Sequence, residues 1–116
     1  RILNFGHIIG HAVEAASGYH LNHGYAVAIG MRAVADLAVR SGLAEPVVAE
    51  RIGDLLRQFH LPLDIPAEYD RSSLRQFMLT DKKARSGRLV FVVPVALGKV
   101  CITDQIDDAI LDAVLA

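Results

Sequence analysis

The sequence is poor in several residues that mark whole classes of protein. Its 116 residues include one cysteine, no tryptophan and four prolines. A single cysteine excludes a disulfide within the chain and is typical of a reducing compartment, so we expect a cytoplasmic protein. The net charge is −1 and no block of Lys or Arg exceeds two residues. Nucleic acid and anionic membranes are therefore not expected as partners.

Long hydrophobic runs are also missing. The longest, Leu89 to Leu97, has nine residues and contains a proline, which is too short to span a bilayer. Hydrophobic residues still make up 53% of the chain and charged residues 22%. The length fits one domain, and the apolar surplus predicts self-association or a place in a larger protein. The chain opens at Arg1 inside a predicted helix, without a signal-peptide pattern, so we expect a fragment.

Apolar spacing and turn residues divide most of the chain into helices. The first covers residues 1–17 and is followed by Gly18 as a C-terminal glycine. The second covers 23–41, closes at Gly42 and is apolar on most faces, which predicts a buried central helix. Pro46 opens a third helix that reaches about residue 59. A loop over 60–69 precedes a short fourth helix over 71–79, capped by Asp70.

The pattern changes in the last third of the chain. β-Branched residues over 88–95 and 99–103 predict a β-hairpin. Thr103 or Asp104 is expected to cap a final helix that runs to Ala116, with Asp104, Asp107 and Asp108 in its first turns. The sequence therefore predicts a mainly α fold, a multihelical domain with one small β-hairpin before the C-terminal helix.

Histidines are concentrated near the start of the chain. His7 and His11 are four residues apart and share one helix face, with Asn4 and Glu14 in the same stripe. Two imidazoles one turn apart can bind a single Zn²⁺ or Fe²⁺, although such pairs are also common on solvated helix faces. His23 opens the next helix, and a short loop can return it to the first. Spacing alone does not choose between His7, His11 and Glu14 as ligands and a set that includes His23.

Two glycines flank these histidines in the first helix. Gly6 and Gly10 precede His7 and His11, although a glycine costs a helix interior about 1 kcal/mol relative to alanine. Their presence predicts the close approach of a ligand or of another backbone. The alternative without chemistry is tight packing between helices.

A lysine pair is the second candidate for ligand binding. Lys82 and Lys83 follow the predicted fourth helix and precede the hairpin. Adjacent ammonium groups can hold a phosphate or a carboxylate, but a solvated turn is the interpretation that sequence alone favours. His20 lies in a predicted loop, and we assign it no chemistry.

Three segments carry a family resemblance: LNFGHIIGHA at residues 3–12, HGYAVAIGM at residues 23–31, and DKK at residues 81–83. Together with Gly87, Leu89, Pro94 and Gly98 they resemble 3-dehydroquinate synthase, in the same order and over almost the whole chain. The resemblance implies that residues 1–116 form the C-terminal, mainly helical domain of that enzyme. Its N-terminal NAD-binding domain would then lie outside the chain.

The resemblance also implies cofactors and metal ligands. The family uses NAD and one divalent metal, usually zinc, to convert 3-deoxy-D-arabino-heptulosonate 7-phosphate to 3-dehydroquinate with release of phosphate, in the shikimate pathway of aromatic amino acid biosynthesis. By position, His7 and His23 resemble the two metal histidines. The third ligand would be a glutamate of the absent domain, which leaves Glu14 with a structural role.

Substrate contacts follow by the same carry-over. His11 resembles the catalytic histidine that assists proton transfer during phosphate loss, and Asn4 resembles a substrate-binding asparagine. The lysine pair resembles the site that grips the phosphate end, with Lys83 favoured over Lys82. Without a hydride acceptor, the isolated chain is expected to be inactive. The family is commonly homodimeric, which makes a homodimer the expected assembly.

The sequence departs from the family at two motif positions. Ile8 stands where the family usually has threonine, and Tyr25 where it usually has glutamate. These departures leave open a sister sugar-phosphate cyclase that acts on another seven-carbon phosphate. A non-catalytic helical interaction module, which keeps the histidine motif for packing, is the alternative from a different functional class.

Overall fold

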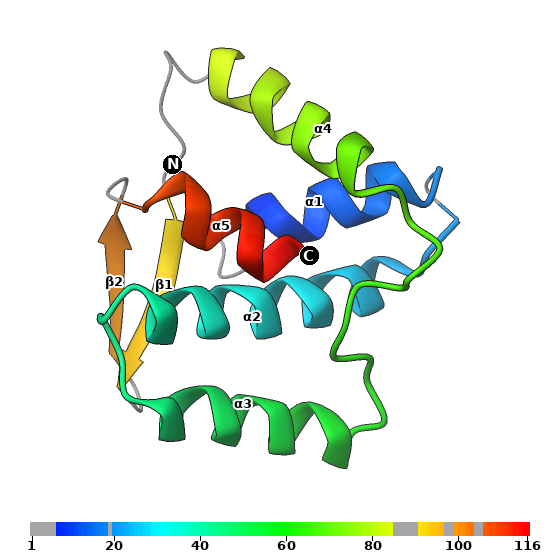
Figure 1. Cartoon of the computed structure of the whole chain (residues 1–116). Coiled ribbons are helices and arrows are strands. Elements are labelled where there is room, and N and C mark those ends of the chain that lie inside the picture. Colours follow the sequence, from blue (N-terminus) through cyan, green and yellow to red (C-terminus); the bar gives the residue numbers. More distant parts are fainter. Residues whose placement is uncertain (1–6, 19, 85–90, 97–98, 104–105) are drawn as a thin grey trace.

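The structure, a computed structural model, describes residues 7–18, 20–84, 91–96, 99–103 and 106–116 (Figure 1). Within these residues, five helices and two strands follow one another along the chain. They are α1 (His7–Ala16), α2 (His23–Arg40), α3 (Pro46–Gln58), α4 (Arg71–Ala84), β1 (Phe91–Ala96), β2 (Lys99–Thr103) and α5 (Asp108–Leu115). The prediction of a mainly helical fold is confirmed.

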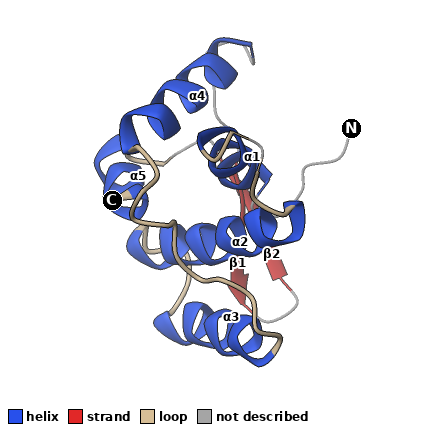
Figure 2. Ribbon diagram, turned by 90° about the vertical axis from the view of Figure 1, so that its right-hand side faces the viewer, coloured by secondary structure: helices blue, strands red, loops and turns tan. Residues whose placement is uncertain are grey.

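Helix α2 is the central element of the fold. Figures 1 and 2 show α1 and α5 on one side of it and α3 on the other, with the strands beside its C-terminal half. Its buried residues are all small or aliphatic: Ala26, Ala28, Ile29, Gly30, Ala33, Val34, Ala35, Leu37 and Ala38. Because helices approach α2 from more than one side, it has no broad polar face. The prediction of a buried central helix is confirmed.

Close contact between α1 and α2 explains one of the glycines. A Cβ atom built on Gly10 would lie 3.1 Å from the carbonyl oxygen of Ala26 and 3.6 Å from Cα of Val27. Glycine therefore lets the two backbones meet, which is the packing alternative rather than the ligand alternative. Gly6 lies outside the described residues.

Helices α2 and α3 end with the same backbone motif. In both, a residue with positive φ follows the helix, and the next amide donates a 2.9 Å hydrogen bond to the carbonyl five residues earlier. This is the Schellman arrangement. Gly42 occupies the left-handed position after α2 with φ of 75°, whereas His60 occupies it after α3 with φ of 58°. The same motif is thus made once with glycine and once with a residue that carries a Cβ atom.

Two predicted helix ends were wrong. Helix α4 continues to Ala84 rather than ending at residue 79, since no glycine or proline interrupts residues 80–84. Lys82 therefore lies in a helix and not in a turn. Helix α5 is capped by Asp107, whose carboxylate accepts a 2.7 Å hydrogen bond from the amide of Ala109. Thr103 belongs to β2, where it pairs with Phe91, and Asp104 lies outside the described residues.

The two strands pair in antiparallel orientation. Phe91 lies opposite Thr103 and Val93 opposite Cys101, with an irregularity between Pro94 and Ala96. Residues 97–98, where the predicted hairpin would turn, lie outside the described residues. None of the described helices combines the length and the apolar character needed to cross a membrane.

Candidate metal and substrate site

Three of the polar side chains singled out from the sequence line one cavity. His11 and Glu14 of α1 meet His23 of α2 there, and Phe77 of α4 provides an apolar wall. The cavity is open to solvent and has a volume of about 290 Å³. The structure therefore brings together residues from both helices that the spacing argument could not choose between.

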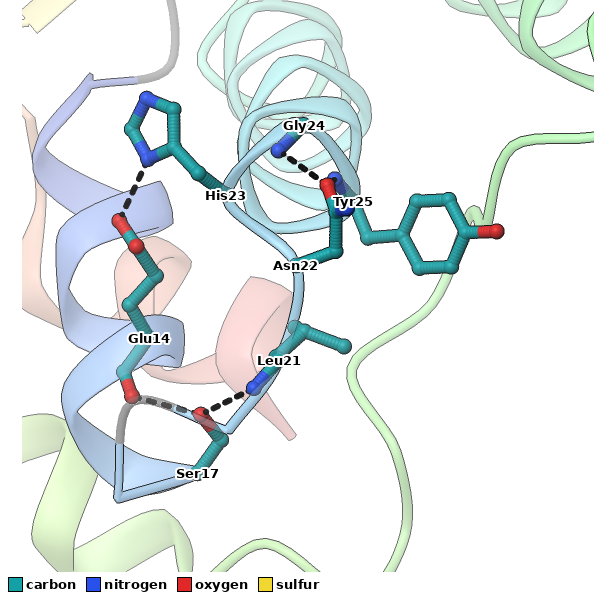
Figure 3. Close-up of polar contacts among 7 residues, drawn as sticks. All are labelled: Glu14, Ser17, Leu21, Asn22, His23, Gly24 and Tyr25. Atoms are coloured by element: carbon teal, nitrogen blue, oxygen red, sulfur yellow. Dashed lines mark hydrogen bonds and ion pairs between the residues drawn. The ribbon is translucent and has the colours of Figure 1, made fainter.

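A serine side chain bridges the two sides of the connection between α1 and α2. The Ser17 hydroxyl donates a 2.7 Å hydrogen bond to the carbonyl oxygen of Glu14 and accepts a 3.2 Å hydrogen bond from the amide of Leu21 (Figure 3). Gly18 follows with φ of 68°, a conformation that glycine adopts without strain. The chain therefore reverses direction within a few residues and returns towards α1.

The start of α2 is fixed by an asparagine cap. The side-chain oxygen of Asn22 accepts hydrogen bonds from the amides of Gly24, at 2.8 Å, and Tyr25, at 3.4 Å. These bonds satisfy two of the amides that a helix N-terminus leaves unpaired. Because His23 lies directly after this cap, its backbone position is fixed by the capped N-terminus of α2.

Glu14 and His23 face each other across this turn. Oε1 of Glu14 lies 3.0 Å from Nδ1 of His23 (Figure 3). The Glu14 side chain is 16% exposed and that of His23 is 68% exposed. A carboxylate accepts hydrogen bonds but cannot donate them, so Nδ1 is the donor in this contact. Figure 3 shows the other ring nitrogen of His23 on the side away from Glu14.

The structure describes the remaining candidate residues of this region to different extents. His11 is exposed on α1 and borders the cavity. His7 begins α1, one turn before His11, but its side chain lies outside the described part of the structure. Asn4 lies outside the described residues altogether. His20 is exposed in the loop after α1 and is not among the residues that line the cavity.

Within the described part of the structure, neither residue of the lysine pair is seen at this cavity. Lys82 is half-buried in α4 and does not line the cavity. Lys83 lies in the same helix, and its side chain is outside what the structure describes. The predicted phosphate grip at Lys82 and Lys83 therefore stays a prediction.

The described donors suit part of a metal site. A histidine that ligates a metal through one ring nitrogen commonly donates its other N–H to a carboxylate, and His23 makes this contact with Glu14. A zinc site in an enzyme ordinarily takes three protein ligands. No group of three or more His, Cys, Asp or Glu residues that could hold a metal occurs within the described part of the chain. His23 thus fits the role of one ligand, and a complete site would need further ligands beyond the described side chains.

The two departures from the family motif lie away from the Glu14–His23 contact. Ile8 is half-buried and packs against the hydrophobic core. Tyr25 is 45% exposed, and Figure 3 shows its ring pointing away from His23. Sequence reasoning missed Phe77 as a wall of the cavity, because nothing in its local pattern distinguishes it from an ordinary core residue of α4.

Comparisons of the sequence with known proteins give a consistent result. A family model described as 3-dehydroquinate synthase C-terminal matches residues 1–84. The 3-dehydroquinate synthase of Acaryochloris marina is 43% identical over 115 residues, which cover 98% of this chain and 31% of that protein. The 3-dehydroquinate synthase of Pyrococcus abyssi is 37% identical over 111 residues, which cover 96% of this chain and 32% of that protein.

Solved structures give the same picture of the fold. A 2-epi-5-epi-valiolone synthase from Streptomyces hygroscopicus, with NAD⁺ and Zn²⁺ bound, superposes on 96% of the chain with a TM-score of 0.82 and 28% identity. A 2-deoxy-scyllo-inosose synthase in complex with carbaglucose-6-phosphate, NAD⁺ and Co²⁺ covers the same share with a TM-score of 0.81 and 27% identity. The chain spans 31% and 32% of these two proteins, and about the same share of its curated relatives.

Proposed function

Because the chain belongs to the 3-dehydroquinate synthase C-terminal family, we propose that it is the metal- and substrate-binding domain of a larger enzyme. In this proposal residues 1–116 form that domain, and the enzyme converts 3-deoxy-D-arabino-heptulosonate 7-phosphate to 3-dehydroquinate with release of phosphate. The observation that carries the proposal is the meeting of His11, Glu14 and His23 in one cavity. The isolated chain, without a hydride acceptor, is inactive.

The metal is held by His7 and His23 of this chain and by a carboxylate of the remaining protein. Zinc is our proposal for the metal, in keeping with the Zn²⁺ and NAD⁺ of the related 2-epi-5-epi-valiolone synthase. When bound, the metal polarises the reacting hydroxyl groups of the substrate and NAD accepts the hydride. His23 binds through the nitrogen that does not face Glu14, since Nδ1 is engaged by the carboxylate.

His11 is the residue to which we give a catalytic role. It lies one turn from His7 on α1 and borders the same cavity as His23. Loss of phosphate requires removal of a proton, and a positioned imidazole can hold or orient that proton. The substrate phosphate itself can serve as the base, in which case His11 orders the transfer. Phe77 gives the cavity one apolar wall.

The remaining contacts of the proposal lie further from the described cavity. Asn4 binds a substrate hydroxyl, and Lys83, with Lys82, binds the phosphate end as a point charge. The NAD-binding domain belongs to the part of the enzyme beyond this chain. A homodimer is the proposed assembly.

A sister sugar-phosphate cyclase is the second candidate. The solved structures that the chain resembles make 2-epi-5-epi-valiolone and 2-deoxy-scyllo-inosose, according to their names. Ile8 and Tyr25 occupy positions where 3-dehydroquinate synthases usually have other residues. Such an enzyme would use the same metal and NAD with another phosphorylated sugar.

Phosphate release by the full-length protein tests the proposal. The assay supplies 3-deoxy-D-arabino-heptulosonate 7-phosphate, NAD and Zn²⁺, and compares wild type with His11→Ala and His20→Ala. We expect His11→Ala to lower kcat about 10²- to 10⁴-fold, the usual contribution of a positioned acid–base group. His20→Ala is the matched control, since His20 is exposed close by in sequence but does not line the cavity.

The outcomes separate the candidate functions. Equal rates for the two histidine variants would contradict the role given to His11. Absence of phosphate release from this substrate, with metal still bound, would identify a sister cyclase. Absence of both release and metal binding would leave the helical interaction module as the function.

A further inference from the structure

We infer that Glu14 is a positioning residue, which selects the ring nitrogen that His23 offers to the metal and holds the imidazole in place. This inference rests on the proposed function, because it takes His23 as a metal ligand. The observation behind it is the 3.0 Å contact between Oε1 of Glu14 and Nδ1 of His23. Spacing along the sequence pointed to Glu14 as a candidate ligand, and the resemblance left it a structural role only.

The chemistry of the contact fixes the tautomer of the imidazole. A neutral imidazole carries one N–H and one nitrogen lone pair. With Nδ1–H donating to Glu14, the lone pair resides on Nε2, and a metal binds the nitrogen that carries the lone pair. Without the carboxylate, both tautomers are populated. Only a fraction of the protein molecules then has the lone pair on Nε2, which is the tautomer that binds the metal.

The two partners differ in how firmly they are held. The Glu14 side chain is largely buried at 16% exposure, whereas the His23 ring is 68% exposed. A mostly exposed ring has few neighbours to restrict its rotation, so the hydrogen bond that Nδ1–H donates to the Glu14 carboxylate restricts it instead. A hydrogen bond to so exposed a ring contributes little to folding stability, so we assign its effect to the orientation of the ring.

The backbones under both residues are tied together independently of this contact. Ser17 bonds to the carbonyl of Glu14 and to the amide of Leu21, and Asn22 caps the helix that His23 opens (Figure 3). Gly10 brings α1 and α2 into backbone contact close to these residues. The carboxylate and the ring thus meet without a large rearrangement of the chain when the metal binds.

Zinc affinity of the metal-free, full-length protein is the first test. The dissociation constant is measured by competition with a chromophoric chelator for wild type, Glu14→Ala, Glu14→Gln and Glu50→Ala. We expect Glu14→Ala to weaken binding about 10- to 100-fold, the usual effect of losing an outer-shell partner. Glu14→Gln keeps an oxygen that accepts from Nδ1–H and should retain more affinity than Glu14→Ala. Glu50, exposed on α3, supplies the control and should bind as wild type does.

The tautomer is a readout that a merely structural role would not move. NMR of the His23 ring nitrogens in the metal-free protein, at about pH 8 where imidazole is ordinarily neutral, should show the proton on Nδ1 in wild type. A wild-type proton on Nε2 would overturn the inference, and this measurement needs no variant to fold. A mixture of tautomers in Glu14→Ala is the expected companion result.

His23→Ala keeps the two proposals separable. If this variant binds Zn²⁺ as tightly as wild type, the ligand assignment in the proposed function fails. If it loses Zn²⁺ while Glu14→Ala binds as tightly as Glu50→Ala, only the positioning role of Glu14 fails.

Discussion

The pair formed by α1 and α2 and the single helix α3 are built in different ways. Helix α2 buries nine residues, and at Gly10 its backbone contacts that of α1. Helix α3 buries only Gly53 and Leu56. Large apolar side chains of α3 and of its C-cap are exposed instead, with Val47 at 46%, Leu55 at 50% and the C-cap Phe59 at 65%.

The difference between α2 and α3 shows that a helix can carry many apolar residues without being firmly packed. Helix α3 packs mainly against α2, with a smaller contact to β1, and lies at the edge of the fold in both views (Figures 1 and 2). The candidate site lies at the α1–α2 junction, where helix ends are capped and backbones are in contact. A site held to within a fraction of an ångström requires such support, and α3 does not offer it. The comparison can be tested by paired substitutions, one in each region.

The largest contrast should come from truncating one leucine in each region. Leu37 of α2 is 0% exposed and Leu55 of α3 is 50% exposed. We expect Leu37→Ala to lower the free energy of unfolding by about 2–5 kcal/mol, because it removes buried contacts and leaves a cavity. Leu55→Ala should change it by less than about 0.5 kcal/mol. Urea denaturation followed by circular dichroism measures both, and similar losses would mean that α3 is as tightly packed as α2.

Two helical glycines should respond to alanine with opposite signs. At Gly10 the new methyl group would meet backbone atoms of α2 at 3.1 Å. Overpacking of this kind costs about 1–3 kcal/mol, which outweighs the gain of about 1 kcal/mol in helix propensity. At Gly53 the nearest atom is the flexible Arg57 guanidinium at 3.7 Å, so Gly53→Ala should raise the free energy of unfolding by about 0.5–1 kcal/mol. Thermal melting of both variants checks the signs, and a stabilising Gly10→Ala would show that the helices can separate at no cost.

The N-terminal caps of the two helices should differ by a smaller amount. Asn22 accepts two amide hydrogen bonds at the start of α2, whereas Glu45 makes no side-chain cap bond at the start of α3. Asn22→Ala should therefore destabilise the protein by about 1 kcal/mol, and Glu45→Ala should have almost no effect. The same urea titration compares them. Equal losses of stability in Asn22→Ala and Glu45→Ala would contradict the capping role of Asn22.

The smallest effect is expected at the C-terminal ends. His60 adopts φ of 58° after α3, where Gly42 adopts 75° after α2. Replacing His60 with glycine relieves a conformation that residues with a Cβ atom adopt at a cost, and should stabilise the protein by about 0.5–1 kcal/mol. Gly42→Ala should destabilise it by a similar amount, although nothing lies within 4 Å of the added atom. A melting temperature that falls in His60→Gly would mean that the His60 side chain contributes to the fold.

Helix ends with a local signal were predictable from the sequence. Gly18 and Gly42 adopt the positive φ that ends a helix without strain, and Pro46 has the fixed φ that suits a first helical turn; the structure has helix boundaries next to all three. The end of α4 was predicted at residue 79 instead of Ala84, because residues 80–84 contain no glycine or proline that marks a helix end. The cap of α5 was predicted wrongly as Thr103 or Asp104, whereas Asp107 caps the helix; Thr103 pairs with Phe91 in the two strands, a contact that local sequence does not reveal.

The site was predictable as a set of residue types but not as a set of contacts. Helical spacing put His11 and Glu14 on one face, and both border the cavity. Glu14 and His23 lie on two helices that a loop connects, so no periodicity within one helix predicts their contact. Phe77 reaches the cavity only through the packing of α4 on α1.

The backbone contact at Gly10 has a consequence for how this family can vary. Since main-chain atoms set the distance between α1 and α2 beside His11 and His23, the aliphatic residues of the core can be exchanged for one another over evolutionary time without moving the histidines apart. Relatives should then diverge freely in core side chains while Gly10 itself is retained.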